Sequence, residues 1–120
     1  MLKKVMKITA IKFKKEFYSL IRKGVKTQTL RRPSGRIDVV PGDFAACVFE
    51  DCPETVYVTI TDVGYKMWKT LNEDDAKREG FESLHELKMF LIRIYPDLNP
   101  WDRFYFYRFK VEGHTEKIGE

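Results

Sequence analysis

The chain has little cysteine and little histidine, and these shortages exclude several classes of protein. Its 120 residues include two cysteines, Cys47 and Cys52, and two histidines, His85 and His114. Two thiols build neither a disulfide framework nor a four-ligand zinc site, and the histidines do not stand at metal-binding spacing with them. We therefore expect no metal and no cofactor. We also expect reduced thiols, with a disulfide across a tight hairpin as the alternative.

Long apolar runs are missing as well. No stretch approaches the roughly 20 apolar residues that a membrane span needs. The amino-terminal sequence MLKKVMKITAIKF alternates charged and apolar residues too closely for the apolar region of a secretory signal. We therefore expect a cytoplasmic protein with no membrane partner. A hydrophobic content of 43% is that of an ordinary globular protein, and the length predicts one domain over residues 1–120.

Acidic residues are almost absent from the first 36 positions. This segment has twelve Lys and Arg residues and one acid, Glu16, whereas residues 37–120 have ten Lys and Arg residues and seventeen acids. Such a one-sided distribution is typical of contact with phosphate groups. Enrichment in charged residues is also a signature of heat stability, but that would not segregate the charges. The pattern favours a polyanionic or nucleotide ligand near the first third of the chain.

The first half of the chain predicts a strand, a helix and then further strands. A β-branched run predicts a strand at 5–13, and helical spacing predicts a helix at 14–24 that ends at Gly24. A turn-rich segment at 33–43 precedes strands at 44–50 and 55–68, which the short turn DCPE would join. Gly64, inside the second of these strands, predicts a bulge or a bend.

The second half predicts two helices and a closing strand. Asn72 is a suitable N-cap for a helix at 71–80, and Ser83 with Glu86 forms the S-x-x-E box of a helix at 83–96. The strand at 103–112 has apolar or aromatic residues on both faces, which predicts a central position in a sheet. The predicted order β-α-β-β-β-α-α-β is that of a mixed α+β domain, a small curled barrel with helices at its ends.

The segment GVKTQTLRR at 24–32 gathers an amine, two hydroxyls and two guanidiniums on one short connector. Its pattern G-x-K-x-x-T-x-R resembles the signature of the ASCH domain, a PUA-like β-barrel family linked to RNA. The resemblance extends along most of the chain, through the turn Pro41–Asp43 and through later residues that match in order. These are Ala76, Glu79, Gly80, Leu84, Glu86, Leu87, Lys88, Tyr95, Pro96 and the aromatic strand 104–109. It implies a PUA-like mixed barrel of about five to six strands with three helices.

Within that family the layout is most similar to the small bacterial N4-acetylcytidine amidohydrolases. The resemblance implies that their catalytic lysine, threonine and glutamate fall on Lys26, Thr29 and Glu79. The segments RRPSGRIDVV and DLNPWDRFYF depart from those enzymes, and both could border the pocket. The resemblance to these enzymes therefore predicts the class of reaction more directly than it predicts the substrate.

The residues themselves are suited to this chemistry if the pKa of Lys26 is lowered and the chain bends between Lys26 and Thr29. A threonine hydroxyl needs a base, and a lysine serves only if its pKa falls from about 10.4 to near neutrality. Burial and neighbouring cations lower it, whereas Glu79 would raise it. We expect Thr29 to attack the amide, Lys26 to accept its proton, Glu79 to protonate the leaving amine, and Arg31 or a backbone N–H to hold the oxyanion. Because Lys26 and Thr29 would face opposite sides of a flat strand, residues 26–28 must bend.

Two other functions remain open at this point. The basic first third also suits a non-catalytic RNA-binding module, and a ribonuclease could use Lys26 and Arg31 to stabilise a phosphorane. The further candidates for substrate or phosphate binding are Arg31, Arg32, Thr27, Arg22, Lys23, Tyr65 and Trp68. The aromatic residues among them could stack on a base, although aromatics in a small domain are more often packing residues.

Overall fold

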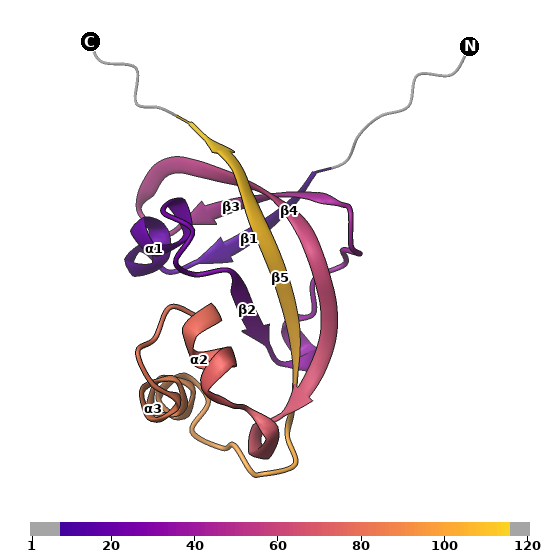
Figure 1. Cartoon of the computed structure of the whole chain (residues 1–120), viewed down its shortest axis with the longest axis vertical. Helices are drawn as coiled ribbons and strands as arrows, with labels where there is room; N and C mark the ends of the chain where they lie inside the picture. The colour runs from indigo at the N-terminus through magenta and orange to yellow at the C-terminus, as the bar shows by residue number, and fades with distance from the viewer. Residues whose placement is uncertain (1–7, 116–120) are drawn as a thin grey trace.

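A computed structural model describes residues 8–115 of the chain. It contains five strands, three α-helices and three short 3-10 turns (Figure 1). In chain order these are β1 (Thr9–Phe13), η1 (Lys15–Phe17), α1 (Tyr18–Arg22), β2 (Gln28–Arg31), η2 (Pro33–Gly35), β3 (Phe44–Phe49), β4 (Cys52–Met67), η3 (Trp68–Thr70), α2 (Glu73–Arg78), α3 (Leu84–Ile94) and β5 (Arg103–His114). The predicted order of strands and helices is confirmed.

All five strands belong to one curled sheet, in the order β1-β3-β4-β5-β2. β1 runs parallel to β3, and the other neighbours are antiparallel. β4 and β5, with 16 and 12 residues, curve across the molecule, and the short strands β1 and β2 form the two edges (Figure 1). The Arg31 guanidinium on β2 donates through Nη2 to the carbonyl of Lys12 on β1 at 2.8 Å. The two edges of the sheet therefore face each other across a seam.

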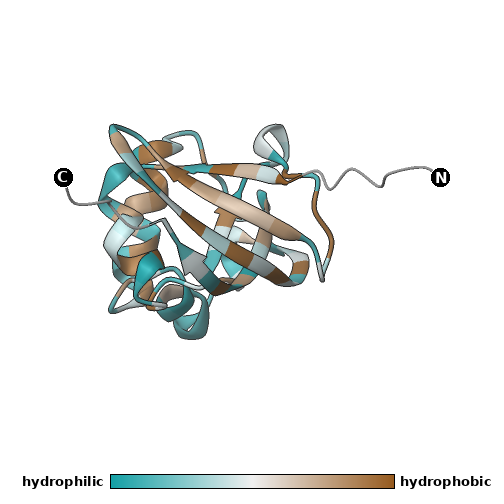
Figure 2. Cartoon of the chain, turned by 90° about the horizontal axis from the view of Figure 1, so that it is seen from above, coloured by the Kyte–Doolittle hydropathy of each residue, from teal (hydrophilic) through white to brown (hydrophobic). Residues whose placement is uncertain are grey.

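Apolar side chains fill two adjoining cores. The larger core lies inside the curl of the sheet and includes Ile11, Ile21, Val56, Val58 and Ile60. The smaller core joins β2 and β5 to the two carboxyl-proximal helices through Leu30, Leu71, Ala76, Leu87, Leu91 and Phe104. Figure 2 shows apolar and polar residues alternating along the long strands, as expected for strands with one face on a core.

The second half of the chain follows the sequence prediction closely. Asn72 caps α2 by accepting from the Asp75 N–H at 3.0 Å, and Ser83 caps α3 by accepting from the Glu86 N–H at 3.2 Å. Glu86 reaches back to the N–H of Glu82 rather than to that of Ser83. β5 lies between β4 and β2, which confirms its interior position.

Three local predictions need correction. The segment 14–24 is not one helix but a 3-10 turn followed by a short α-helix. The hairpin turn is the residue pair 50–51, not DCPE, because Asp51 takes a positive φ of 55° and β4 already begins at Cys52. Of the two alternatives at Gly64, the bulge is wrong, because no register shift falls there; a Cβ at this position would lie 2.6 Å from the Phe106 ring. The predicted first strand is described from Thr9 onward, and its residues 5–7 lie outside the described range.

Candidate active site

The carboxyl-terminal ends of α1 and α2 lie next to each other beside Lys26. α1 ends in a Schellman motif, with Gly24 at φ 76°, its N–H on the Ile21 carbonyl and the Val25 N–H on the Leu20 carbonyl. This turn changes the chain direction just before residues 26–28, where the bend is predicted, and Lys26 and Thr29 line the same pocket. α2 ends in the same way at Gly80, whose φ is 92°.

The Gly80 turn packs directly against Lys26. A Cβ at Gly80 would lie 3.4 Å from the Cβ of Lys26 and 3.2 Å from the Leu20 side chain, so only glycine fits both the backbone conformation and the space. The backbone of the Gly24 turn is tied to α2 by the Thr27 N–H, which donates to the Arg78 carbonyl at 2.7 Å. These contacts hold the ends of α1 and α2 together.

Lys26 and Glu79 form a buried ion pair at this junction. The Lys26 Nζ donates to Glu79 Oε1 at 3.0 Å and to the Glu79 backbone carbonyl at 3.1 Å. The two residues are 3% and 4% exposed, and the lysine amine also lies 4.8 Å from the centre of the Phe17 ring. The second carboxylate oxygen, Oε2, is buried and is the one buried side-chain oxygen or nitrogen among residues 8–115 that has no hydrogen-bond partner.

Burial moves both members of this pair towards their neutral forms. Desolvation lowers the pKa of Lys26 below its ordinary value of 10.5, although the charge and hydrogen bond of Glu79 oppose the change. Desolvation likewise raises the pKa of Glu79 above 4.5, against the opposing effect of Lys26. The nearby Gln28 amide also favours the carboxylate, but its Nε2 donates to Asp75, which leaves Glu79 Oε2 without a partner. Burial therefore brings the pKa values of the amine and the carboxyl group closer together.

Thr29 is buried on β2 and has Arg31 as its neighbour. Arg31 Nε donates to Thr29 Oγ1 at 3.0 Å, so the hydroxyl oxygen accepts a charged donor while its own proton stays available to a base. The Arg31 guanidinium lies 5.0 Å from the centre of the Phe13 ring and carries further N–H groups beyond those bound to Thr29 and Lys12. The only buried thiol among the described residues, Cys47, is held protonated because burial raises its pKa to about 12.

The reactive side chains open into a pocket of about 180 Å³ at the seam between β1 and β2. Lys26, Thr29 and Arg31 line one part of it, and aromatic rings line much of the remainder. The complete lining is Lys12, Phe13, Lys14, Phe17, Lys26, Thr29, Leu30, Arg31, Phe90, Ile94 and Tyr95. Glu79 is not part of the wall and lies behind Lys26. Its contact with the pocket runs through the lysine, to which both its carboxylate and its backbone carbonyl are hydrogen-bonded.

A larger surface hollow of about 690 Å³ lies elsewhere, at the start of β1 and β3. The residues that line it within the described range are Ile8, Thr9, Ala10, Asp38, Gly42, Asp43 and Phe44. None of them belongs to an ion pair within residues 8–115, whereas Lys26 in the seam pocket is paired with Glu79, so the smaller seam pocket is the better candidate for chemistry.

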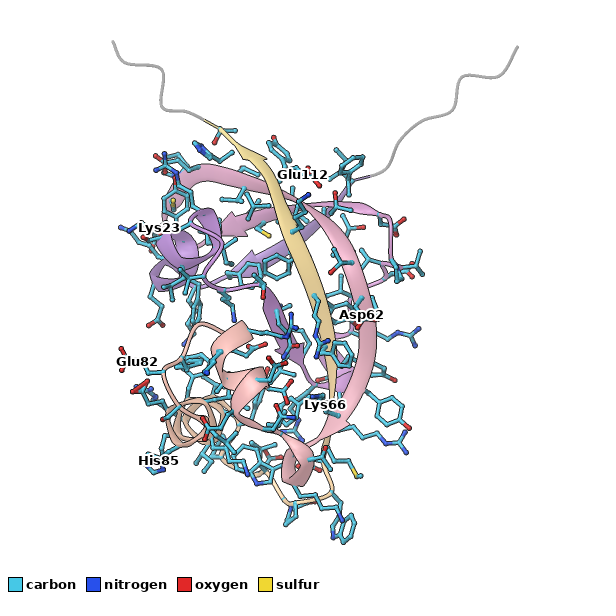
Figure 3. The ribbon with its side chains drawn as sticks, viewed as in Figure 1. Lys23, Asp62, Lys66, Glu82, His85 and Glu112 are labelled. Atoms are coloured by element: carbon cyan, nitrogen blue, oxygen red, sulfur yellow. The ribbon has the colours of Figure 1, made fainter. Side chains whose placement is uncertain are left out.

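A polar network that the sequence did not indicate supports the site from behind. Gln28 and Asp75 are both fully buried, and Gln28 Nε2 donates to Asp75 Oδ1 at 3.3 Å. Arg108 Nε donates to Gln28 Oε1 at 2.8 Å, and Lys66 Nζ donates to Asp75 Oδ2 at 2.8 Å. Figure 3 shows Lys66 and Asp62, the ion-pair partner of Arg108, on the same long strand β4.

Two sequence signals could have found this network. Gln28 lies inside the recognised motif, between Thr27 and Thr29. Asp75 precedes Glu79 by four residues, which places both acids on one face of a helical segment. The aromatic lining of the pocket has no comparable signal, because Phe13, Phe17 and Phe90 are ordinary core residues by their spacing.

The other predicted binding residues lie outside the pocket. Arg32 pairs with Asp97 at 2.8 Å and Asp102 at 3.8 Å, and Thr27 is half-buried with its backbone bonded to Arg78 and Phe109. Arg22 and Lys23 are exposed at the end of α1, where Figure 3 labels Lys23.

The two aromatic candidates are also separate from the seam. Tyr65 is exposed on β4 with the Arg103 guanidinium 4.9 Å from its ring centre. Trp68 packs against the smaller core, with the Lys88 amine 5.0 Å from its ring centre. Of the seven predicted binding residues, only Arg31 lines the pocket.

The searches for metal and membrane features gave negative findings. Within residues 8–115, no three His, Cys, Asp or Glu residues are grouped as metal ligands. In the same range, no helix has the length and apolar character required to cross a membrane.

Comparison with known proteins identifies the fold. The sequence matches no protein-family model and no curated protein. Its structure is similar to the ASCH domain from Lactobacillus crispatus, with a TM-score of 0.62, 20% identity and coverage of 78% of this chain and 68% of that one. It is also similar to a protein of Enterococcus faecalis assigned to the family DUF984, with a TM-score of 0.69, 16% identity and coverage of 94% and 80%.

A third similar structure is a serine-to-alanine mutant of the ASCH protein from Zymomonas mobilis. Its TM-score is 0.61 at 17% identity, and the match covers 88% of this chain and 68% of that one. The chain therefore has the fold of these ASCH-domain structures, a curled five-stranded sheet with three helices. The fold that the motif at 24–31 predicted is confirmed.

Proposed function

We propose that the chain is an amidohydrolase that removes an acyl group from a modified nucleoside such as N4-acetylcytidine. The observation that carries this proposal is the buried pair of Lys26 and Glu79 beside Thr29 in an aromatic-lined pocket. A site that only binds phosphate gains nothing from an acid held against its lysine, whereas a site that moves protons needs both groups.

The proposed reaction begins with proton exchange inside the pair. When the shared proton lies on Glu79, Lys26 is a neutral amine and can accept the proton of the Thr29 hydroxyl. Thr29 Oγ1 then bonds to the acyl carbon, and the Arg31 N–H groups stabilise the resulting oxyanion. The C–N bond breaks, and the leaving amine takes the proton that Lys26 had accepted from Thr29, so Lys26 is again neutral while Glu79 keeps its proton.

Hydrolysis of the acyl-threonine completes the cycle. Lys26 accepts a proton from water, the hydroxide attacks the ester carbon, and Thr29 leaves with a proton returned from Lys26. The products are the free nucleobase amine and a carboxylate. In this scheme Glu79 acts through Lys26, which agrees with its place behind the pocket wall.

The experiment is a chromatographic assay of purified protein with N4-acetylcytidine. We expect cytidine and acetate with wild type, none with Lys26→Met or Thr29→Val, and full turnover with Lys110→Met, an exposed lysine outside the pocket. Mass spectrometry of quenched reactions should find the acetyl group on the peptide containing Thr29. Circular dichroism of each variant separates lost chemistry from lost folding. Absence of cytidine at high concentrations of folded wild-type protein would refute the proposal.

A second candidate, a non-catalytic RNA-binding module, is supported by a specific observation. The exposed cations Lys12 and Lys14 stand at the pocket mouth, as a phosphate-binding edge requires. Steep salt dependence of binding to an RNA strand, without turnover of the nucleoside, would favour this candidate over the amidohydrolase.

A further inference from the structure

The seam pocket is too small for a whole nucleoside. Its volume of about 180 Å³ lies below the roughly 300–1,000 Å³ of pockets that enclose complete small ligands. A planar base and its acyl group can lie among Phe17, Phe90 and Tyr95, next to Thr29. The sugar, and any group attached to it, must then remain at the mouth.

The mouth of this pocket is basic. Lys12 and Lys14 flank Phe13 at the end of β1, both are exposed, and neither forms an ion pair within residues 8–115. Among residues 8–115, no carboxylate lines the pocket. Lys26 is paired with Glu79, and Arg31 is bound to Thr29 and the Lys12 carbonyl inside the pocket, so Lys12 and Lys14 are the lysines at the mouth that have no ion-pair partner within residues 8–115.

The mouth continues into shallow grooves on both sides. One groove, of about 450 Å³, shares Lys14, Phe90 and Ile94 with the pocket and adds Arg93 and Glu16. The other, of about 270 Å³, shares Lys12 and Phe13 and adds Glu50 with two apolar residues. Each groove contains one acid, Glu16 or Glu50, and neither acid lines the seam pocket.

We propose that Lys12 and Lys14 bind a phosphate group attached to the nucleoside, so that the acylated base is presented as a nucleotide. This inference rests on the proposed function, and it assigns a phosphate subsite that the motif at 24–32 does not include. The nucleotide can be a free mononucleotide or one residue of an RNA strand. Both place a phosphate within reach of a sugar held at the mouth.

The first test measures binding and does not depend on turnover. Cytidine, cytidine 5′-monophosphate and cytidine 3′-monophosphate are titrated into wild type, into Lys12→Gln/Lys14→Gln and into the charge-matched control Lys77→Gln/Lys110→Gln. We expect at least one nucleotide to bind wild type about tenfold more tightly than cytidine, since two partly exposed charge contacts are each worth a few-fold. The advantage should disappear in the first variant and persist in the control.

Replacing Lys12 leaves its backbone carbonyl, which Arg31 binds, in place. The proposal would be overturned if wild type bound cytidine and both nucleotides with equal affinity. It would also be overturned if Lys12→Gln/Lys14→Gln still bound a nucleotide more tightly than cytidine. A phosphate advantage in a protein that turns over no acylated substrate would uphold the subsite and refute the amidohydrolase, so the two failures are distinguishable.

The second test identifies the source of the phosphate. Values of kcat/KM are compared for N4-acetylcytidine, its 5′-monophosphate and a short RNA that contains one N4-acetylcytidine. Faster turnover of the RNA, weakened by added salt, indicates a strand, and faster turnover of the mononucleotide indicates a free nucleotide. Fastest turnover of the unphosphorylated nucleoside would contradict the inference.

Discussion

Substitution of Lys26 by methionine should destabilise the fold in a strongly pH-dependent way. The change removes the amine that pairs with Glu79 Oε1 at 3.0 Å and leaves the carboxyl group 4% exposed, with Oε2 already lacking a partner. A buried carboxylate without its cation is costly, and breaking such a pair typically costs about 3–5 kcal/mol. Glu79 can avoid part of that cost by taking up a proton when the protein is folded.

The magnitude follows from the ordinary pKa of 4.5 for this glutamate in the unfolded chain. Holding such a group neutral costs about 3.5 kcal/mol at about pH 7 and about 1 kcal/mol at about pH 5, because each pKa unit corresponds to about 1.4 kcal/mol. Burial raises the pKa of Glu79 in the folded state. The stabilisation that protonated Glu79 gives the folded state is therefore complete below the pKa of the unfolded chain and is lost as the pH rises through the pKa of the folded state. Wild type lacks this dependence because its pair holds one proton in both states.

Urea denaturation of wild type, Lys26→Met and Lys26→Met/Glu79→Gln at both pH values tests this reasoning. We expect the difference in unfolding free energy between wild type and the single variant to be about 2.5 kcal/mol larger at about pH 7 than at about pH 5. The double variant has no group to titrate at this position, so its difference from wild type should be the same at both. A single variant that is equally destabilised at both pH values would show that Glu79 is not forced to become neutral, and the proton-exchange scheme would fail.

Two further predictions follow from the same geometry. The rate of deacylation should rise with pH as Lys26 loses its proton, with a midpoint below 10.5 because burial lowers the pKa of Lys26. In Glu79→Gln the residual activity should have a still lower midpoint, since Glu79 raises the pKa of Lys26. A midpoint that does not move in this variant would contradict the coupling between the two residues. Gly80→Ala should destabilise the protein by about 1–2 kcal/mol in urea and reduce activity, because alanine is strained at φ 92° and its Cβ would press on Lys26 and Leu20. Gly35→Ala, where a Cβ meets nothing within 4 Å, is the control and should be close to neutral; equal effects of the two substitutions would refute the packing argument.

Much of the local structure could be predicted because it depends on short-range rules. Asn72 and Ser83 cap their helices as expected, and Gly24 and Gly80 end theirs with the positive φ that glycine tolerates best. Where the prediction was wrong, tertiary packing decided the outcome. Gly64 is explained by the Phe106 ring across the sheet rather than by a bulge, and no pattern within β4 could reveal that neighbour.

The candidate site was only partly predictable for a similar reason. The motif at 24–31 and Glu79 were identified as a cluster, and the structure brings Lys26, Thr29, Arg31 and Glu79 together. Their catalytic roles stay a prediction. The cations next to the motif in sequence are not the ones at the pocket: Arg22 and Lys23 lie at the outer end of α1, whereas Lys12 and Lys14 stand at the mouth.

The sequence by itself determined the order of the helices and strands and the residues that cap or end α2 and α3, because capping, turn chemistry and periodicity act over a few neighbouring residues. Only the tertiary structure decided the protonation chemistry. Lys26 and Glu79 are 53 positions apart, and their pKa values are shifted because folding removes both from water and places them 3.0 Å apart. Desolvation depends on what every surrounding segment covers, which no local pattern records.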